Sequence, residues 1–71
     1  MSEYLEVLFP HQRVVLINGV SMGETNKLLE LEGGNYEVKL APPEDFTPKR
    51  QQIDLRNTSV LEPMQVEFKV I

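Results

Sequence analysis

The sequence contains no cysteine, no tryptophan and only one histidine, His11. Without cysteine the chain can form neither a disulfide nor a thiolate metal site. Small secreted domains often depend on disulfides, and the first residues lack the basic segment and apolar run of a signal peptide. We therefore expect a cytoplasmic protein.

Positive charge and long apolar runs are also scarce. The chain has 7 Lys and Arg against 11 Asp and Glu, which gives a net charge of -4. Such an acidic chain is repelled by the phosphates of nucleic acids and by anionic lipid headgroups. No apolar stretch approaches the ~20 residues that cross a bilayer. We expect no nucleic-acid partner and no membrane insertion, and we interpret the charge as favouring solubility.

The single histidine bears on catalysis. A general base needs a partner and a pocket, whereas His11 lies in a predicted turn, and one histidine cannot hold zinc without further strong ligands. The neighbouring Glu44 and Asp45 point to opposite sides of an extended segment. Gly33 and Gly34 are not followed by the helix that a phosphate-binding loop requires. We predict a protein that is not an enzyme and uses no cofactor or metal.

Alternation of apolar and polar residues is the main positive signal, and it is the period of half-buried strands. The clearest strand is Tyr36 to Leu40. Asn26 to Glu32 contains good helix formers, but a segment of about seven residues is short for a helix, so we interpret it as a strand. The inward positions predicted by the alternation are Leu5, Val7, Phe9, Val15, Ile17, Leu29, Leu31, Tyr36, Val38, Leu40, Ile53, Leu55, Met64, Val66, Phe68 and Val70.

Turn signals divide these strands. Asn18-Gly19 suits a type I′ hairpin turn, because both central residues of that turn have positive φ. The segment Ala41 to Arg50 holds three prolines and cannot be regular throughout; within it, Phe46 is expected to plug the edge of the core. Arg56 to Pro63 is interpreted as a loop. Residues 1–71 are thus predicted to form one all-β domain, a small antiparallel β-sandwich of about six or seven short strands.

Part of this pattern resembles the PEGA domain family, most strongly over Pro10–Leu40. Members of that family usually carry a Pro-Glu-Gly-Ala-like turn, a short strand ending in Asp-Gly or Asn-Gly, a Gly-x-Thr-Pro turn and a Gly-x-Tyr-x-Val segment. The matching elements in this chain are Asn18-Gly19, Gly23-Glu24-Thr25 and Gly34-Asn35-Tyr36-Glu37-Val38.

The chain departs from the family pattern at two places. Only Pro10 remains of the namesake tetrapeptide, and Asn26 stands where the family usually has proline. The resemblance implies a prealbumin-like β-sandwich of the kind that mediates binding within larger proteins. Since the motif residues are mostly turn and core positions, the resemblance bears on the fold more than on the function.

The preferred functional hypothesis is a noncatalytic protein-binding or assembly module. Tyr4, Leu8, Leu16 and Leu28 fall on outward positions of the first strands, where they can form an apolar patch for a protein partner or a second copy. Edge strands of a small sandwich also invite strand addition by a partner.

The alternative hypothesis is a small-ligand or carbohydrate-binding module. It would use the Pro42–Arg50 loop, through Phe46, Lys49 and Arg50. Sugar sites commonly stack a pyranose on an exposed aromatic ring, and the pattern leaves Tyr4 as the exposed aromatic candidate.

Overall fold

The computed structural model describes residues 2–71, and within them it contains nine strands and no helix. The strands are β1 (Ser2–Leu8), β2 (Val14–Ile17), β3 (Val20–Glu24), β4 (Leu28–Glu32), β5 (Gly34–Leu40), β6 (Phe46–Thr47), β7 (Gln51–Leu55), β8 (Met64–Glu67) and β9 (Lys69–Val70). The prediction of an all-β domain is confirmed, with two strands of only two residues added to seven longer ones.

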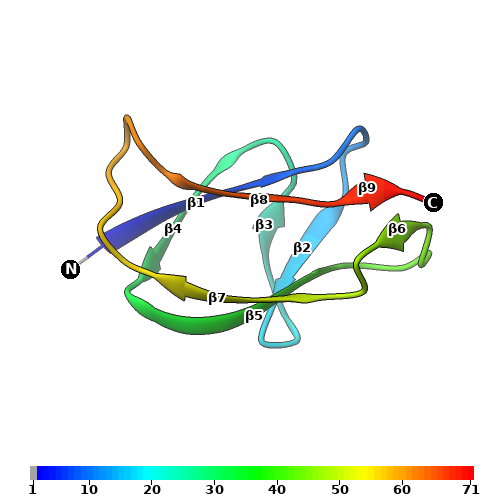
Figure 1. The fold of residues 1–71 in the computed structure, drawn as a ribbon, viewed down its shortest axis with the longest axis horizontal. Helices are drawn as coiled ribbons and strands as arrows, with labels where there is room; N and C mark the ends of the chain where they lie inside the picture. The colour runs from blue at the N-terminus through cyan, green and yellow to red at the C-terminus, as the bar shows by residue number, and fades with distance from the viewer. Residues whose placement is uncertain (1) are drawn as a thin grey trace.

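These strands form two main sheets and one small one. Sheet A has the order β4-β1-β8, sheet B the order β3-β2-β5-β7, and sheet C pairs β6 with β9. Sheets A and B enclose one hydrophobic core (Figure 1). The core side chains are Leu5, Val7, Phe9, Val15, Ile17, Leu29, Leu31, Val38, Leu40, Phe46, Leu55, Val66 and Phe68.

One pairing differs from the predicted antiparallel arrangement. β1 pairs antiparallel with β4 but parallel with β8, in a register that sets Leu5 beside Met64. Alternation shows which side chains face the core, and it is the same in both arrangements because successive side chains point to opposite faces in either. The sequence pattern therefore contained no signal for strand direction.

The β2–β3 hairpin has the predicted turn. Asn18 and Gly19 have φ values of 50° and 81°, as a type I′ turn requires. The register between the two strands shifts beside Val15 and Leu16, and Met22 is the residue of β3 left without a partner opposite. This bulge adds local twist to a strand that lies at the edge of sheet B.

Three aromatic rings close one end of the sandwich. Phe46 packs edge-on against Phe9 and Phe68, with ring centroids 6.4 and 5.7 Å apart, and Phe46 plugs the core as predicted. The inward position predicted for Val70 is wrong, since this side chain is 46% exposed. The chain leaves sheet A after Phe68, and Val70 then pairs with Phe46 of β6 at the end of the core.

Candidate functional site

Three of the four residues of the predicted apolar patch lie on the outer face of sheet A. Tyr4 and Leu8 belong to β1 and are half-buried, whereas Leu28 in β4 is 45% exposed. We call this outer surface the acidic face, because it holds four glutamates and the strands of sheet A contain no Lys, Arg or His. Its residues are Tyr4, Glu6, Leu8, Leu28, Glu30, Glu32, Gln65 and Glu67.

Leu16 lies elsewhere, so the prediction of a single four-residue patch is wrong. Its neighbours Val15 and Ile17 face the core, which directs Leu16 to the outer face of sheet B. There it stands opposite Lys39 of β5. Alternation assigns a residue to the inside or outside of its own strand, but it does not say to which of the two sheets that strand belongs.

Beside Leu16 the outer surface is slightly concave. We call this depression, of about 170 Å³, the lysine hollow. Lys39 and Lys49 take part in no ion pair among the described residues, so both ammonium groups can meet a ligand. The residues that line the hollow are Leu16, Lys39, Leu40, Pro42, Glu44, Phe46 and Lys49.

The predicted ligand loop is only partly available to a ligand. Phe46 is 3% exposed and belongs to the core, so its ring cannot stack on a sugar. Lys49 is exposed at the lysine hollow. The exposed Arg50 lies 3.6 Å from Glu37, measured from Nε to Oε2. The structure thus brings Lys49 together with Leu16 rather than with an accessible aromatic ring.

A groove that the sequence did not predict opens between β3 and β4. We call it the β3–β4 groove; its volume is about 590 Å³. Val20 and Met22 on β3 are 57% and 46% exposed within it. The lining residues are Ser2, Ile17, Asn18, Val20, Met22, Glu30, Leu31, Glu32 and Tyr36. An apolar floor with polar groups at the rim is typical of a binding surface.

The groove exists because one end of β3 is left uncovered. Val20 pairs with Ile17, so its side chain lies on the core side of sheet B, yet more than half of it meets solvent. Alternation gives no warning of this, because an inward position is normally a buried one. Both strands beside the groove are edge strands of their sheets, so each presents unpaired backbone groups.

At the opposite end the two strands approach closely. Gly23 of β3 has a φ of +152°, and a Cβ added there would overlap Cδ2 of Leu29 on β4. Only glycine permits this contact. The strands therefore meet at Gly23 and leave the space at Val20 and Met22 open.

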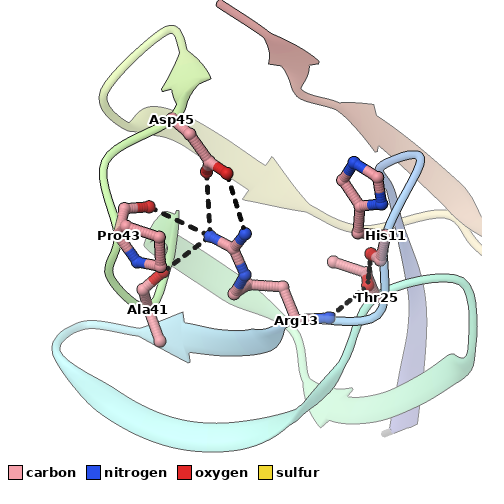
Figure 2. Close-up of polar contacts among 6 residues, drawn as sticks. All are labelled: His11, Arg13, Thr25, Ala41, Pro43 and Asp45. Carbon is pink, nitrogen blue, oxygen red and sulfur yellow. Dashed lines mark hydrogen bonds and ion pairs between the residues drawn. The ribbon is translucent and has the colours of Figure 1, made fainter.

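The turn between β3 and β4 is anchored to the segment that joins β1 to β2. The Oγ1 of Thr25, which is 1% exposed, accepts a hydrogen bond from the Arg13 N–H and donates one to the His11 carbonyl, at 2.9 and 2.7 Å (Figure 2). The Asn26 side chain accepts from the Phe9 N–H at 3.2 Å and donates to the Phe9 carbonyl at 2.7 Å. Asn26 has a φ of 63°, which proline cannot adopt.

Arg13 fixes the loop of residues 41–50 against the sandwich (Figure 2). Its Nη1 and Nη2 donate to Oδ1 and Oδ2 of Asp45 at 3.0 and 3.1 Å. Nη1 also donates to the carbonyls of Ala41 and Pro43 at 3.2 and 3.0 Å. The hydrogen bonds from Arg13 hold the pKa of Asp45 below its usual range. Each of these groups has a structural partner, so we interpret the cluster as a support for the loop.

Within the described residues 2–71, no group of three or more His, Cys, Asp and Glu could hold a metal ion. In the same part of the chain, no helix has the length and apolar character needed to span a membrane. His11 is exposed and packs edge-on against Phe9, with ring centroids 5.7 Å apart.

These features define a small β-sandwich domain whose accessible features are the acidic face, the lysine hollow and the β3–β4 groove. The sequence profile of the PEGA domain matches residues 9–67, and the chain belongs to the PEGA domain family. The resemblance predicted from the turn motifs is thereby confirmed. A search of curated proteins and a search of solved structures found no match.

Proposed function

We propose that the chain is a noncatalytic protein-binding or assembly module that holds an extended segment of a partner protein in the β3–β4 groove. The observation that carries this proposal is the exposure of Val20 and Met22 on an apolar surface between two free strand edges. Such a surface offers both kinds of contact that an added strand makes.

The two kinds of contact have separate roles. The free edge of β3 can pair with the backbone of the incoming segment, which supplies affinity without regard to sequence. Alternate side chains of that segment would then lie on Ile17, Val20 and Leu31, which selects apolar residues at every second position. Burying an apolar side chain contributes about 1.5–3 kcal/mol. Since association also costs translational and rotational freedom, we expect affinities in the micromolar range.

The test is selection of a random-peptide library on the folded chain, followed by NMR titration with a selected peptide. We expect enrichment of peptides with alternating apolar residues and amide shifts concentrated in β3 and β4. Val20→Asp should weaken the selected peptide about tenfold or more, because it places a charge on the apolar floor. Leu61→Asp is the matched control, since Leu61 is 92% exposed and does not line the groove. Shifts confined to another surface, or equal loss from both variants, would contradict the proposal.

The alternative, a small-ligand or carbohydrate module, would use the lysine hollow. Its volume of about 170 Å³ is enough for a small anion or one substituent of a sugar. What supports it is the pair Lys39 and Lys49, both without an ion-pair partner among the described residues. An NMR titration with a panel of simple and sulfated sugars tests it: shifts at Lys49 and Arg50 that leave β3 unchanged would favour this alternative.

A further inference from the structure

The two outer faces of the sandwich differ in charge. On the acidic face, the carboxylates of Glu30 and Glu67 stand opposite Tyr4 and Leu8 of the central strand β1. The three strands of sheet A contain no basic residue, so no cation of these strands neutralises them. The acidic face thus combines apolar side chains at its centre with negative charge on both flanking strands.

The outer face of sheet B carries the complementary arrangement. Leu16 is a half-buried apolar residue of this face, and Lys39 stands directly opposite it. Lys49 joins them at the lysine hollow, where Glu44 is the only acidic lining residue. The remaining acidic groups nearby are engaged, because Glu37 faces Arg50 and Asp54 binds Arg56 at 2.8 Å.

We propose that two copies of this chain associate head to tail, with the lysine hollow of one copy on the acidic face of the next. This inference rests on the proposed function in naming a partner, a second copy, for an assembly module; Glu30 and Glu32 border both the acidic face and the β3–β4 groove. Leu16 of one copy would lie among Tyr4, Leu8 and Leu28 of the other. The four apolar residues that were predicted to form one patch would thus meet across the contact between two molecules.

Charge complementarity favours a second copy of the chain as the partner on the acidic face. Both halves of the contact are present on the same molecule, with two unpaired lysines on one side and Glu30 and Glu67 on the other. Two acidic faces would repel each other, and so would two lysine hollows. A symmetric dimer through either face is therefore disfavoured, and the contact joins unlike faces.

The small size of the contact limits the strength of this association. The lysine hollow is lined by seven residues, far fewer than the ~20–30 residues a side of a standard interface. We expect weak association that depends on salt, because exposed ion pairs are screened over about 8 Å at physiological ionic strength. Contact between unlike faces leaves one free face at each end of a pair, so further copies can add as the concentration rises.

The test is sedimentation velocity of the full chain over a range of concentrations, at low and high salt. We expect the weight-average sedimentation coefficient to rise with concentration at low salt and to stay flat at high salt. Glu67→Lys removes attraction from the acidic face without changing a residue of the groove, and Lys39→Glu removes it from the lysine hollow. Each variant alone should associate at least about tenfold more weakly than wild type.

A mixture of the two variants is the decisive measurement. Glu67→Lys retains an intact lysine hollow and Lys39→Glu retains an intact acidic face, so the mixture should restore association between the two variants. Glu62→Lys makes the same charge change in the turn of residues 59–62, outside the acidic face, and should self-associate as wild type does. Val20→Asp in the groove should also leave self-association unchanged, which separates this inference from the groove proposal.

Three results would overturn the inference. The first is a wild-type chain that remains monomeric at low salt up to its solubility limit. The second is self-association that survives both charge reversals. The third is a mixture of the two variants in which no pair forms although each variant has lost association alone; that result would place the contact between like faces.

Discussion

Thr25 and Asn26 bind the backbone of the segment between β1 and β2 through their side chains. The two residues satisfy the N–H and carbonyl groups of Phe9, the N–H of Arg13 and the carbonyl of His11. Leaving such groups unpaired in a buried place costs about 1–3 kcal/mol each. At this scale, two polar side chains hold the segment between β1 and β2, which belongs to no sheet, against the turn between β3 and β4.

Arg13 and Asp45 give a prediction that depends on pH. The hydrogen bonds from Arg13 lower the pKa of Asp45 in the folded chain. The paired carboxylate therefore stabilises the fold above the ordinary aspartate pKa of 3.8, and this contribution is lost as the pH falls through the lower, folded-state pKa. Asp45→Asn should have a lower urea midpoint than wild type at pH 7, and the difference should shrink as the pH falls below 3.8.

Circular dichroism of urea unfolding across that pH range measures the difference between the two midpoints. Glu3 and Glu24 also have lowered pKa values, because they accept hydrogen bonds from Thr58 and Lys27, respectively. Both are present in wild type and variant, so they cancel in the comparison. Glu44→Gln, at the preceding residue, is the control and should leave the urea midpoint nearly unchanged. A difference for Asp45→Asn that is the same at pH 7 and at low pH would contradict the argument.

At the scale of elements, β3 and β4 touch at one end and part at the other. Gly23 and Gly34 both have a φ of +152°, but only at Gly23 would a Cβ meet another side chain, that of Leu29. Gly23→Ala and Gly34→Ala should each lower the free energy of unfolding by about 1–3 kcal/mol, because alanine is strained at this φ. Gly23→Ala should cost about 1–3 kcal/mol more, because Leu29 must shift within the core.

Chemical denaturation of both glycine variants measures this difference in the free energy of unfolding. Leu29→Val combined with Gly23→Ala should recover part of the additional loss, since it removes the overlapping methyl group. Equal destabilisation by Gly23→Ala and Gly34→Ala would show that the contact with Leu29 is unimportant.

Some features of the strands could be predicted from the sequence, and others could not. Alternation identified the buried face of the longer strands except β3, and Asn18-Gly19 identified the hairpin turn, because both signals are local. The parallel β1–β8 pair, the separation of Leu16 from Leu28 and the uncovered Val20 depend on how distant strands meet. Alternation within one strand carries no information about contacts between distant strands, so these features appear only in the folded chain.

At the scale of the molecule, the fold is closed by its last long strand. β8 completes sheet A beside β1, and it leads into Phe68, which is 1% exposed and the largest fully buried side chain. Without β8, sheet A would have two strands, which are marginal without further support. The stability of the whole domain therefore depends on contacts between the two ends of the sequence.

Truncation tests this dependence. A chain that ends at Pro63 lacks Val66 and Phe68, whose burial contributes about 1.5–3 kcal/mol each out of a typical total of 5–15 kcal/mol. We expect it to be unfolded, with no cooperative thermal transition by circular dichroism. A chain that ends at Phe68 loses only the exposed residues 69–71 and should stay folded. A cooperative transition in the shorter chain would show that sheet B and the β1–β4 pair suffice.

The parallel pairing of β1 with β8 has a consequence for how the domain bears tension. The start of β1 and the end of β9 lie at opposite ends of the long axis (Figure 1). Pulling on the two ends draws β1 and β8 past each other along their length. Their hydrogen bonds, which join Leu5–Leu8 to Met64–Glu67, then resist together in shear instead of opening one after another. As one link in a longer polypeptide under tension, the domain would resist stretching through this pair.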